Sequence, residues 1–377
     1  MRFVFGEYKT DVFIDREIPC IEKIAAVANE YSGNAFFNIL VVCDENTSRI
    51  ADAMVADAAG NYGAIRARNL PRCVLKSGEK SKSWDSVQAI LAAAQKAGVG
   101  RDGIFIGVGG GVIGDLCGFA ASIYMRGCRF IMVSTTLLGM VDASIGGKTG
   151  IDLFGIKNLA GSFYPAEAVY MPLDCLSALT QPEWKSGLGE LIKTAVLDGD
   201  DFLDELASIA VCSNAPAELY KNPLLLKFIN RAVSFKAQIV SEDPKELGNK
   251  RALLNLGHTF AHALESSSDL GNISHGEAVA WGIVRSCELG YALGITPRSR
   301  AGKIIDLVRL FGYCCSAPHP LAANTGSFYK ALKSDKKIKQ DKMIFIVPDE
   351  SSARPVFIET EKEKNILVKI TKGDFVI

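Results

Sequence analysis

The chain has 377 residues, of which 48% are hydrophobic and 22% are charged, so its composition is that of an ordinary globular protein and excludes a disordered one. Its 42 basic and 42 acidic residues give a net charge of zero, which removes any whole-molecule attraction to nucleic acid or to an anionic membrane. The first ten residues, MRFVFGEYKT, lack the apolar core of a signal peptide, and we therefore expect a cytoplasmic protein.

The first part of the chain alternates between short apolar runs and segments with apolar residues at helical spacing. Such alternation is typical of β-α-β units. The expected strands are 38–43, 73–75, 104–108 and 130–134, and the expected helices are 46–59, 82–97 and 112–124. This order predicts an α/β domain over residues 1–175, with a doubly wound and mainly parallel sheet.

The second part of the chain has a different pattern. From Glu183 to about Leu332 nearly every segment has helical periodicity, with breaks at prolines. We therefore predict a mainly α-helical domain over residues 176–377. The tail of this domain predicts three short strands, at 343–347, 355–359 and 366–370.

Histidine is rare and clustered, since three of the four histidines are His258, His262 and His275. On a helix, His258 and His262 lie on one face at i and i+4, and His275 opens the next helical segment. Imidazoles together with a carboxylate are the usual ligands of catalytic zinc, and Glu190 is a candidate carboxylate. The alternatives are hydrogen-bonded or capping histidines, and for Glu190 an exposed ion pair with Lys193. The cluster favours a metal site.

A glycine-rich loop follows the expected strand 104–108. Gly109, Gly111 and Gly114 satisfy the pattern G-x-G-x-x-G, in which free backbone N–H groups at a helix start bind a pyrophosphate. The next expected strand, however, ends without the acidic residue that usually binds the ribose, and Asp44 is the candidate replacement. The alternative is a tight turn in a protein that binds no nucleotide.

Several basic residues stand beside glycines or inside segments that otherwise read as buried. They are Lys148, Lys157, Lys193, Lys236, Lys250 and Arg251. Each by itself is more simply a solvated surface residue, but together they indicate an anionic substrate.

From about Val41 to Val347 the chain resembles the 3-dehydroquinate synthases, within the sugar phosphate cyclases. The resemblance rests on motifs in a specific order and spacing: GEKSKS at 78–83, VGGGVIGDLCGF at 108–119, STTLLGMVDASIGGKTGID at 134–152, GLGELIK at 187–193, RALLNLGHTFAHALE at 251–265, HGEAVAWG at 275–282 and SDKK at 334–337. It implies an NAD-dependent lyase with zinc or cobalt that forms homodimers. Such an enzyme converts 3-deoxy-D-arabino-heptulosonate 7-phosphate into 3-dehydroquinate and phosphate in the shikimate pathway.

The resemblance also assigns roles to residues. It makes Glu190, His258 and His275 the metal ligands and places His262 beside the substrate, in place of the His258–His262 ligand pair that the spacing suggests. The implied cofactor contacts are Asp44, Glu79, Lys82, Gly109, Gly110, Gly111, Asp115, Thr135 and Thr136. The implied meeting point of cofactor and substrate is formed by Asp142, Lys148, Lys157 and Asn158. The implied substrate contacts are Lys193, Lys236, Arg251, Asn255, His262 and one of Lys336 and Lys337, with Arg126 reaching the phosphate site of a neighbouring subunit.

One departure weakens part of this transfer, because the segment 241–246 is one residue longer than the usual pattern before Arg251. It bears on Lys236 and Lys250. The main alternative function is that of a sibling cyclase acting on sedoheptulose 7-phosphate or glucose 6-phosphate. Metal-dependent alcohol dehydrogenases and a non-catalytic nucleotide-binding protein are further alternatives.

Overall fold

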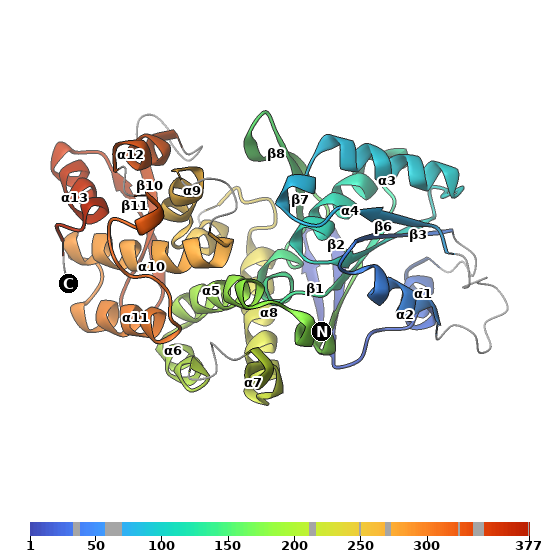
Figure 1. The fold of residues 1–377 in the computed structure, drawn as a ribbon, viewed down its shortest axis with the longest axis horizontal. Coiled ribbons are helices and arrows are strands. Elements are labelled where there is room, and N and C mark those ends of the chain that lie inside the picture. The colour runs from blue at the N-terminus through green and yellow to red at the C-terminus, as the bar shows by residue number, and fades with distance from the viewer. Residues whose placement is uncertain are drawn as a thin grey trace. The chain divides into compact units, whose positions relative to one another are not determined.

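The computed structural model describes residues 1–32, 38–56, 70–210, 216–248, 250–267, 273–322, 325–334, 343–375 and 377. The chain divides into two compact units, Met1–Ala178 and Leu179–Ile377 (Figure 1). Among the described helices, none is both long enough and apolar enough to cross a membrane.

The first unit is built on a seven-stranded sheet with the order β1-β2-β9-β6-β5-β3-β4. Its strands are β1 (Arg2–Phe5), β2 (Tyr8–Asp15), β3 (Ile39–Asp44), β4 (Arg72–Leu75), β5 (Ile104–Gly109), β6 (Arg129–Ser134) and β9 (Ala168–Pro172). Only β1 and β2 pair antiparallel in this sheet, and the other pairs are parallel. The predicted fold of an α/β unit with a mainly parallel sheet is confirmed.

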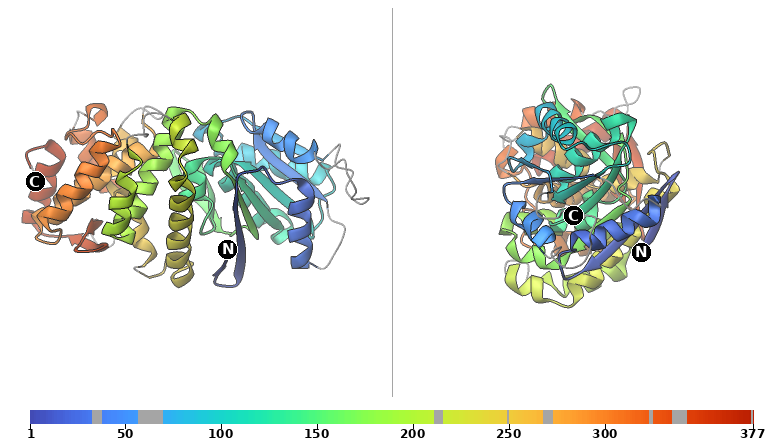
Figure 2. Two further views of the ribbon diagram at one scale, coloured as in Figure 1. Left: turned by 90° about the horizontal axis from the view of Figure 1, so that it is seen from below. Right: turned by 90° about the vertical axis from the view of Figure 1, so that its right-hand side faces the viewer.

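Helices cover this sheet (Figure 2). They are α1 (Ile21–Ser32), α2 (Ser48–Ala56), α3 (Trp84–Lys96) and α4 (Gly111–Ile123). Alternate residues of the central strands, such as Val41, Ile106 and Val133, pack in one core cluster with Ile24 of α1 and Met54 of α2. Successive side chains of a strand point to opposite faces, so one face of β3, β5 and β6 enters this core. The other face of these strands is buried as well, and the strands therefore appear in the sequence as continuous apolar runs.

The carboxyl ends of the central strands meet at one edge of the sheet. In the register of the parallel pairs, Cys43 of β3 lies beside Val108 of β5, and Gly109 of β5 lies beside Ser134 of β6. Residues that follow these strands are therefore neighbours, although they are far apart in sequence. In doubly wound folds this edge is where ligands bind.

Two strands that the sequence pattern does not predict form a separate hairpin in the first unit, β7 (Lys148–Leu153) with β8 (Ile156–Phe163). Glycines and exposed polar residues interrupt both strands, so neither shows the apolar alternation on which strand prediction depends. The strands β1, β2 and β9 also lie outside the predicted set.

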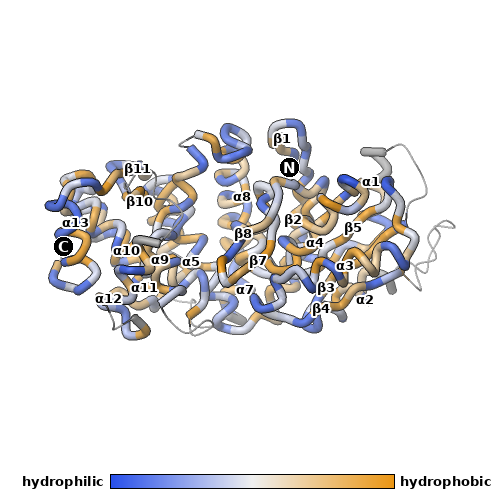
Figure 3. The backbone as a smooth tube through the Cα atoms, turned by 90° about the horizontal axis from the view of Figure 1, so that it is seen from above, coloured by the Kyte–Doolittle hydropathy of each residue, from blue (hydrophilic) through white to orange (hydrophobic). Residues whose placement is uncertain are grey.

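The second unit is mainly helical, as predicted. Its helices are α5 (Gln181–Asp198), α6 (Asp200–Ala207), α7 (Pro216–Lys221), α8 (Leu224–Glu242), α9 (His258–Ser267), α10 (His275–Ala292), α11 (Arg298–Leu310), α12 (Thr325–Ser334) and α13 (Glu361–Lys372). A hairpin of β10 (Met343–Pro348) and β11 (Ala353–Ile358) matches two of the three strands predicted for the tail. Along the helices the tube alternates between hydrophobic and hydrophilic colours, as expected of amphipathic segments (Figure 3).

The third predicted strand of the tail, 366–370, is wrong, because these residues belong to α13. A capping box of Thr360 and Glu363 starts this helix, and Gly373, with a φ of 78°, ends it. Leu367 and Ile370 are buried at helical spacing. The run Ile-Leu-Val-Lys-Ile has a high strand propensity, but the capping box before it and the glycine after it favour a helix.

Helix α10 packs against α5 and α9 with unusually close backbones. A Cβ atom on Gly276 would overlap the carbonyl oxygen of Ser186 in α5, and one on Gly189 would overlap the carbonyl oxygen of Gly276. A second close approach joins Gly282 of α10 to Gly257, which directly precedes α9 and has a φ of 78°. Glycine is needed at these positions because no other residue leaves room for the neighbouring backbone.

Candidate metal centre and nucleotide-binding loop

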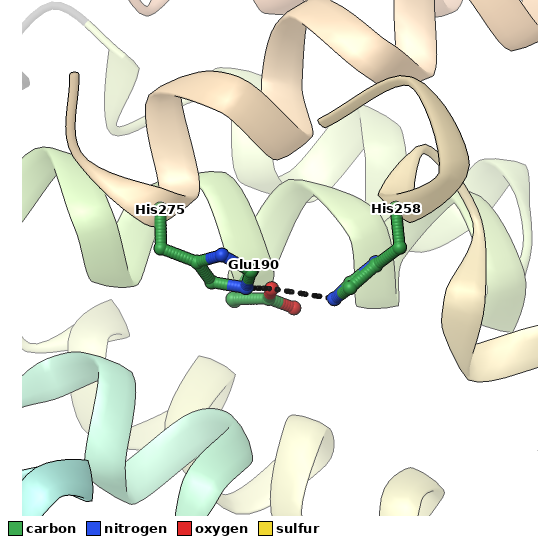
Figure 4. Close-up of side chains that lie close together, drawn as sticks. All are labelled: Glu190, His258 and His275. Carbon is green, nitrogen blue, oxygen red and sulfur yellow. Dashed lines mark ion pairs between the residues drawn. The ribbon is translucent and has the colours of Figure 1, made fainter. Parts of the chain in front are cut away.

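Three side chains from three helices of the second unit converge on one point. Glu190 lies in the middle of α5, His258 is the first residue of α9 and His275 is the first residue of α10. Each offers one ligand atom, and these atoms all lie within 4.8 Å of one another. Oε1 of Glu190 is 3.5 Å from Nε2 of His258 and 3.2 Å from Nε2 of His275 (Figure 4).

The electrostatics of this centre favour a cation. The side chain of Glu190 is 0% exposed, and its carboxylate oxygens have no hydrogen bond of good geometry among the described residues. Its contacts are ion pairs, with Lys193 Nζ 2.5 Å from Oε2 and the two imidazoles at Oε1. Lys193 offsets the buried charge at Oε2, while Oε1 faces the two imidazoles, where a bound cation would stabilise it further. Two imidazole nitrogens and one carboxylate oxygen form a donor set that fits zinc or cobalt.

The ring of His275 lies between two carboxylates, those of Glu190 and Glu265. Desolvation lowers its pKa, but the nearby carboxylates of Glu190 and Glu265 outweigh desolvation and raise the pKa to about 10. The two carboxylates thus favour a positive charge at this ring.

His262 lies outside this group. Its ring centroid is 5.6 Å from that of His258, one helical turn further along α9. Helical spacing thus places His262 beside His258, but His262 does not belong to the group of converging ligand atoms. Glu190, His258 and His275 converge instead, which is the set that the family resemblance implies.

The basic residues expected to contact substrate in this unit are buried. Lys193 is 1% exposed, Arg251 is 2% exposed and Lys236 is 8% exposed. Buried cations are rare unless they are paired or face a ligand, and their anion partners bind more strongly in a low dielectric. Asn255 ends the short 3-10 helix Arg251–Asn255 and donates to Glu246 Oε1 at 3.2 Å. Lys336 and Lys337 lie outside the described residues.

Asp243, which the sequence analysis does not single out, organises the loop that leads to Arg251. Its carboxylate accepts backbone N–H groups from Leu247 at 2.9 Å, Gly248 at 3.1 Å and Arg251 at 3.3 Å. The Arg251 guanidinium donates to the carbonyl of Pro244 at 2.5 Å. The sequence signal for such a role is an acidic residue at the end of a helix followed by proline and glycine, which is typical of a loop held by a side chain.

We expect Asp243→Asn to reduce the free energy of unfolding by about 1.5–3 kcal/mol, since a charged acceptor of backbone hydrogen bonds becomes a neutral one. Burial raises the pKa of Asp243, but the backbone hydrogen bonds and the charge of Arg251 outweigh it and hold the pKa below its usual 3.8. The carboxylate therefore stabilises the fold fully above about pH 4 and loses this effect as the pH falls. Urea unfolding at several pH values should show a deficit that shrinks in acid, and a pH-independent deficit would contradict this account.

In the first unit, the glycine-rich loop has the geometry of a pyrophosphate site. Strand β5 ends at Gly109 and α4 begins at Gly111, so the backbone of the loop leads directly into the helix N-terminus. A Cβ atom on Gly109 would lie 2.7 Å from Ile113, and one on Gly110 would lie 2.9 Å from Thr136. An added side chain at either position would force its neighbour to shift, and glycine allows the backbone N–H groups to come close to a bound phosphate.

A polar cluster lies beside this loop. Nζ of Lys82 is 2.5 Å from Oδ2 of Asp115 and 2.5 Å from Oδ1 of Asn158. Burial raises the pKa of Asp115 to about 6, although Lys82 partly offsets it. Asn158 has a left-handed φ of 50°, and its backbone N–H donates to Asp152, a residue missed by the sequence analysis.

The other residues implied to bind the cofactor lie around the same edge of the sheet. Asp44 ends β3, and its Oδ1 accepts hydrogen bonds from the Thr47 hydroxyl at 2.8 Å and the Thr47 N–H at 2.9 Å, so it also shapes the start of α2. The Thr135 N–H donates to the Gly109 carbonyl at 2.9 Å. Thr136 accepts the N–H of Gly139 at 3.0 Å, at the start of a π-helical turn that carries Asp142. Glu79 lies in the 3-10 helix Glu79–Ser81 that precedes Lys82.

Three further predicted residues also lie in the first unit. Lys148 begins β7 and Lys157 lies in β8, and both are exposed. Arg126 and the preceding Met125 have left-handed φ values of 72° and 49°. Such values are strained for side-chain-bearing residues, and strained backbone of this kind clusters at functional sites.

Comparison with known proteins shows which family this chain is similar to. The family model described as 3-dehydroquinate synthase N-terminal matches residues 72–186, and the one described as 3-dehydroquinate synthase C-terminal matches residues 187–338. The 3-dehydroquinate synthase of Acidithiobacillus ferrooxidans is 40% identical over 275 residues, which are 73% of each chain.

Two solved structures are similar over nearly the whole chain. The 2-epi-5-epi-valiolone synthase of Streptomyces hygroscopicus, with NAD+ and Zn2+ bound, has a TM-score of 0.79 at 25% identity, covering 97% of this chain and 98% of that one. A 2-deoxy-scyllo-inosose synthase complexed with carbaglucose-6-phosphate, NAD+ and Co2+ has a TM-score of 0.77 at 22% identity, covering 100% of both chains. At this level of identity the second structure shows the shared fold.

Proposed function

The chain belongs to the 3-dehydroquinate synthase family, and on this premise we propose that it converts 3-deoxy-D-arabino-heptulosonate 7-phosphate into 3-dehydroquinate and phosphate, in the shikimate pathway. The observation that carries the proposal is the convergence of Glu190, His258 and His275 on one buried point. It stands beside buried cations suited to an anionic substrate.

The reaction is an oxidation, a phosphate elimination, a reduction, a ring opening and an intramolecular aldol closure. NAD, when bound, supplies a reversible hydride acceptor, so that no net redox change results. Zinc or cobalt, when bound, supplies a Lewis acid that polarises a substrate oxygen. Glu190, His258 and His275 would hold the metal. The glycine loop, Asp44, Glu79, Lys82, Asp115, Thr135 and Thr136 would hold NAD, with Asp142, Lys148 and Lys157 beside them.

The residues of the chain itself bind, orient and move protons. Lys193, Lys236 and Arg251 are buried basic donors, so they bind the phosphate and carboxylate of the substrate and keep the leaving phosphate in place. His262 and Asn255 orient the substrate hydroxyls, and the imidazole of His262 can exchange a proton with one of them. Positioning and electrostatics then provide most of the rate enhancement, in keeping with the scarcity of nucleophiles.

The proposal also covers the oligomeric state of the enzyme and its location in the cell. We place the enzyme in the cytoplasm as a homodimer, in which Arg126 of one subunit reaches the phosphate site of the other. This part is supported by the family resemblance and by the strained backbone that presents Arg126. Sedimentation of the wild-type protein and of Arg126→Ala, together with their kinetics, would separate a role in assembly from a role in substrate binding.

The test is a phosphate-release assay with the proposed substrate, catalytic NAD and zinc, in which NADH is followed and a chelator serves as a control. We expect stoichiometric phosphate and dehydroquinate, no accumulating NADH and loss of activity with chelator. Turnover of sedoheptulose 7-phosphate or glucose 6-phosphate in place of this substrate would assign the chain to a sibling cyclase. Steady NADH formation from a simple alcohol would overturn the cyclase mechanism.

A further inference from the structure

We propose that Glu265 is a positioning residue for the metal centre, which fixes the ring of His275 so that its Nε2 faces the metal; this inference rests on the metal site of the proposed function. The imidazole of His275 has both nitrogens against carboxylates. Nε2 lies 3.2 Å from Oε1 of Glu190, and Nδ1 lies 3.2 Å from Oε1 of Glu265. Glu265 lies near the end of α9 and is 8% exposed.

The backbone of His275 is already fixed by other contacts. Ser274 and Glu277 form a capping box at the start of α10, in which the Ser274 hydroxyl accepts the N–H of Glu277 and the Glu277 carboxylate accepts the N–H of Ser274. Gly276, the next residue, lies against the backbone of Ser186. The rotation of the side chain is the freedom that remains to His275, and its hydrogen bond to Glu265 restricts that rotation.

The two histidines of the centre are supported differently. Nδ1 of His258 lies 3.2 Å from the carbonyl oxygen of Leu256, which is a neutral acceptor, whereas Nδ1 of His275 meets a carboxylate. In both rings a proton on Nδ1 leaves the lone pair of Nε2 directed at the metal position. A carboxylate partner also makes the imidazole a more basic ligand, and the loss of such a partner typically weakens metal binding by about 10- to 100-fold.

The side chain of His275 is 32% exposed, against 12% for His258 and 0% for Glu190. It is therefore the ligand that packing restrains least, and the one for which a hydrogen-bond partner matters most. Glu265 supplies this restraint from α9, the helix that also carries His258. One short helix would thus hold one ligand directly and orient a second through a hydrogen bond.

The experiment compares the wild type with Glu265→Gln and Glu265→Ala, using Glu277→Gln as the matched control. Glu277 lies two residues from His275, and glutamine preserves its capping box, so this variant removes a nearby negative charge without touching the ring. Affinities for zinc and for cobalt would be measured by competition with a chromophoric chelator, and the visible absorption of the cobalt protein would report ligand geometry. Thermal unfolding of the metal-free proteins would report the fold.

We expect Glu265→Gln to bind both metals about 10- to 100-fold more weakly, with an altered cobalt spectrum, while Glu277→Gln stays within about twofold of the wild type. Glu265→Ala should be weaker still, because it keeps no acceptor. Equal losses in Glu265→Gln and Glu277→Gln, or wild-type affinity and spectrum in Glu265→Gln, would overturn the positioning role. A wild type that binds neither metal would overturn the metal site itself, and with it the proposed function.

Discussion

Replacement of His258 by alanine is expected to lower turnover by about a thousandfold or more. A bound cation supplies several kcal/mol of transition-state stabilisation, and each ~1.4 kcal/mol corresponds to a factor of ten in rate. The substitution removes one of three ligand groups while it leaves the buried pair of Glu190 and Lys193 in place. The measurement is kcat after metal stripping and after addition of zinc, with zinc content determined on the same samples.

The matched control is His262→Ala, one turn along the same helix. Its ring is 5.6 Å from that of His258, and it lies outside the triad, so this variant should keep its zinc even though substrate turnover falls. The pair of variants thus separates the triad from the ligand pair that helical spacing suggests. Wild-type activity of metal-stripped His258→Ala, or loss of zinc in His262→Ala, would show that the ligand assignment is wrong.

Gly276→Ala is expected to have the second largest effect, although it adds only one methyl group. The new Cβ would overlap the carbonyl of Ser186, and its three nearest atoms all belong to the Ser186 backbone, so α10 must move away from α5. Overpacking of this kind costs about 1–3 kcal/mol of unfolding free energy. Because Glu190 lies on α5 and His275 starts α10, the same movement separates two ligands, and zinc affinity should fall together with stability.

Chemical denaturation and chelator competition on the same preparation would measure both quantities. The control is Gly302→Ala in the middle of α11, where the added methyl group meets nothing within 4 Å. It should be neutral or stabilising by up to about 1 kcal/mol, because alanine restricts the unfolded chain and favours a helix. Unchanged zinc affinity in Gly276→Ala would mean that the two helices can separate without disturbing the centre.

The sequence predicts the parts of this fold that follow local rules. The strands β3, β5 and β6 are apolar runs because both of their faces are buried, and the loop from Gly109 to Gly111 is recognisable because its glycines stand between a strand and a helix. The helices of the second unit follow from their periodicity. In the tail, the sequence pattern predicts a strand over residues 366–370, but these residues form part of α13, because capping residues start and end a helix there.

The metal centre is only partly predictable, because its contacts join residues that are distant in sequence. Helical spacing places His262 beside His258, and this is true of the structure, but spacing cannot decide which imidazole faces Glu190, 68 residues earlier in the chain. That choice depends on where α10 begins and how closely it approaches α5. The roles of Asp243, Asp152 and Glu265 depend on similar non-local contacts, and none of these residues stands out in composition or spacing.

Each of the three ligands is next in the chain to a glycine in tight backbone contact. Gly189 precedes Glu190, Gly257 precedes His258 and Gly276 follows His275, and all three glycines lie against other backbone. These backbone contacts prevent the helices from shifting relative to one another, so the backbones of the three ligands stay in fixed positions. A bound ion would have to leave by rotation of one side chain. His275, the most exposed ligand, is the one able to rotate first, so the rate of metal exchange should follow the motion of this single ring rather than the opening of the unit.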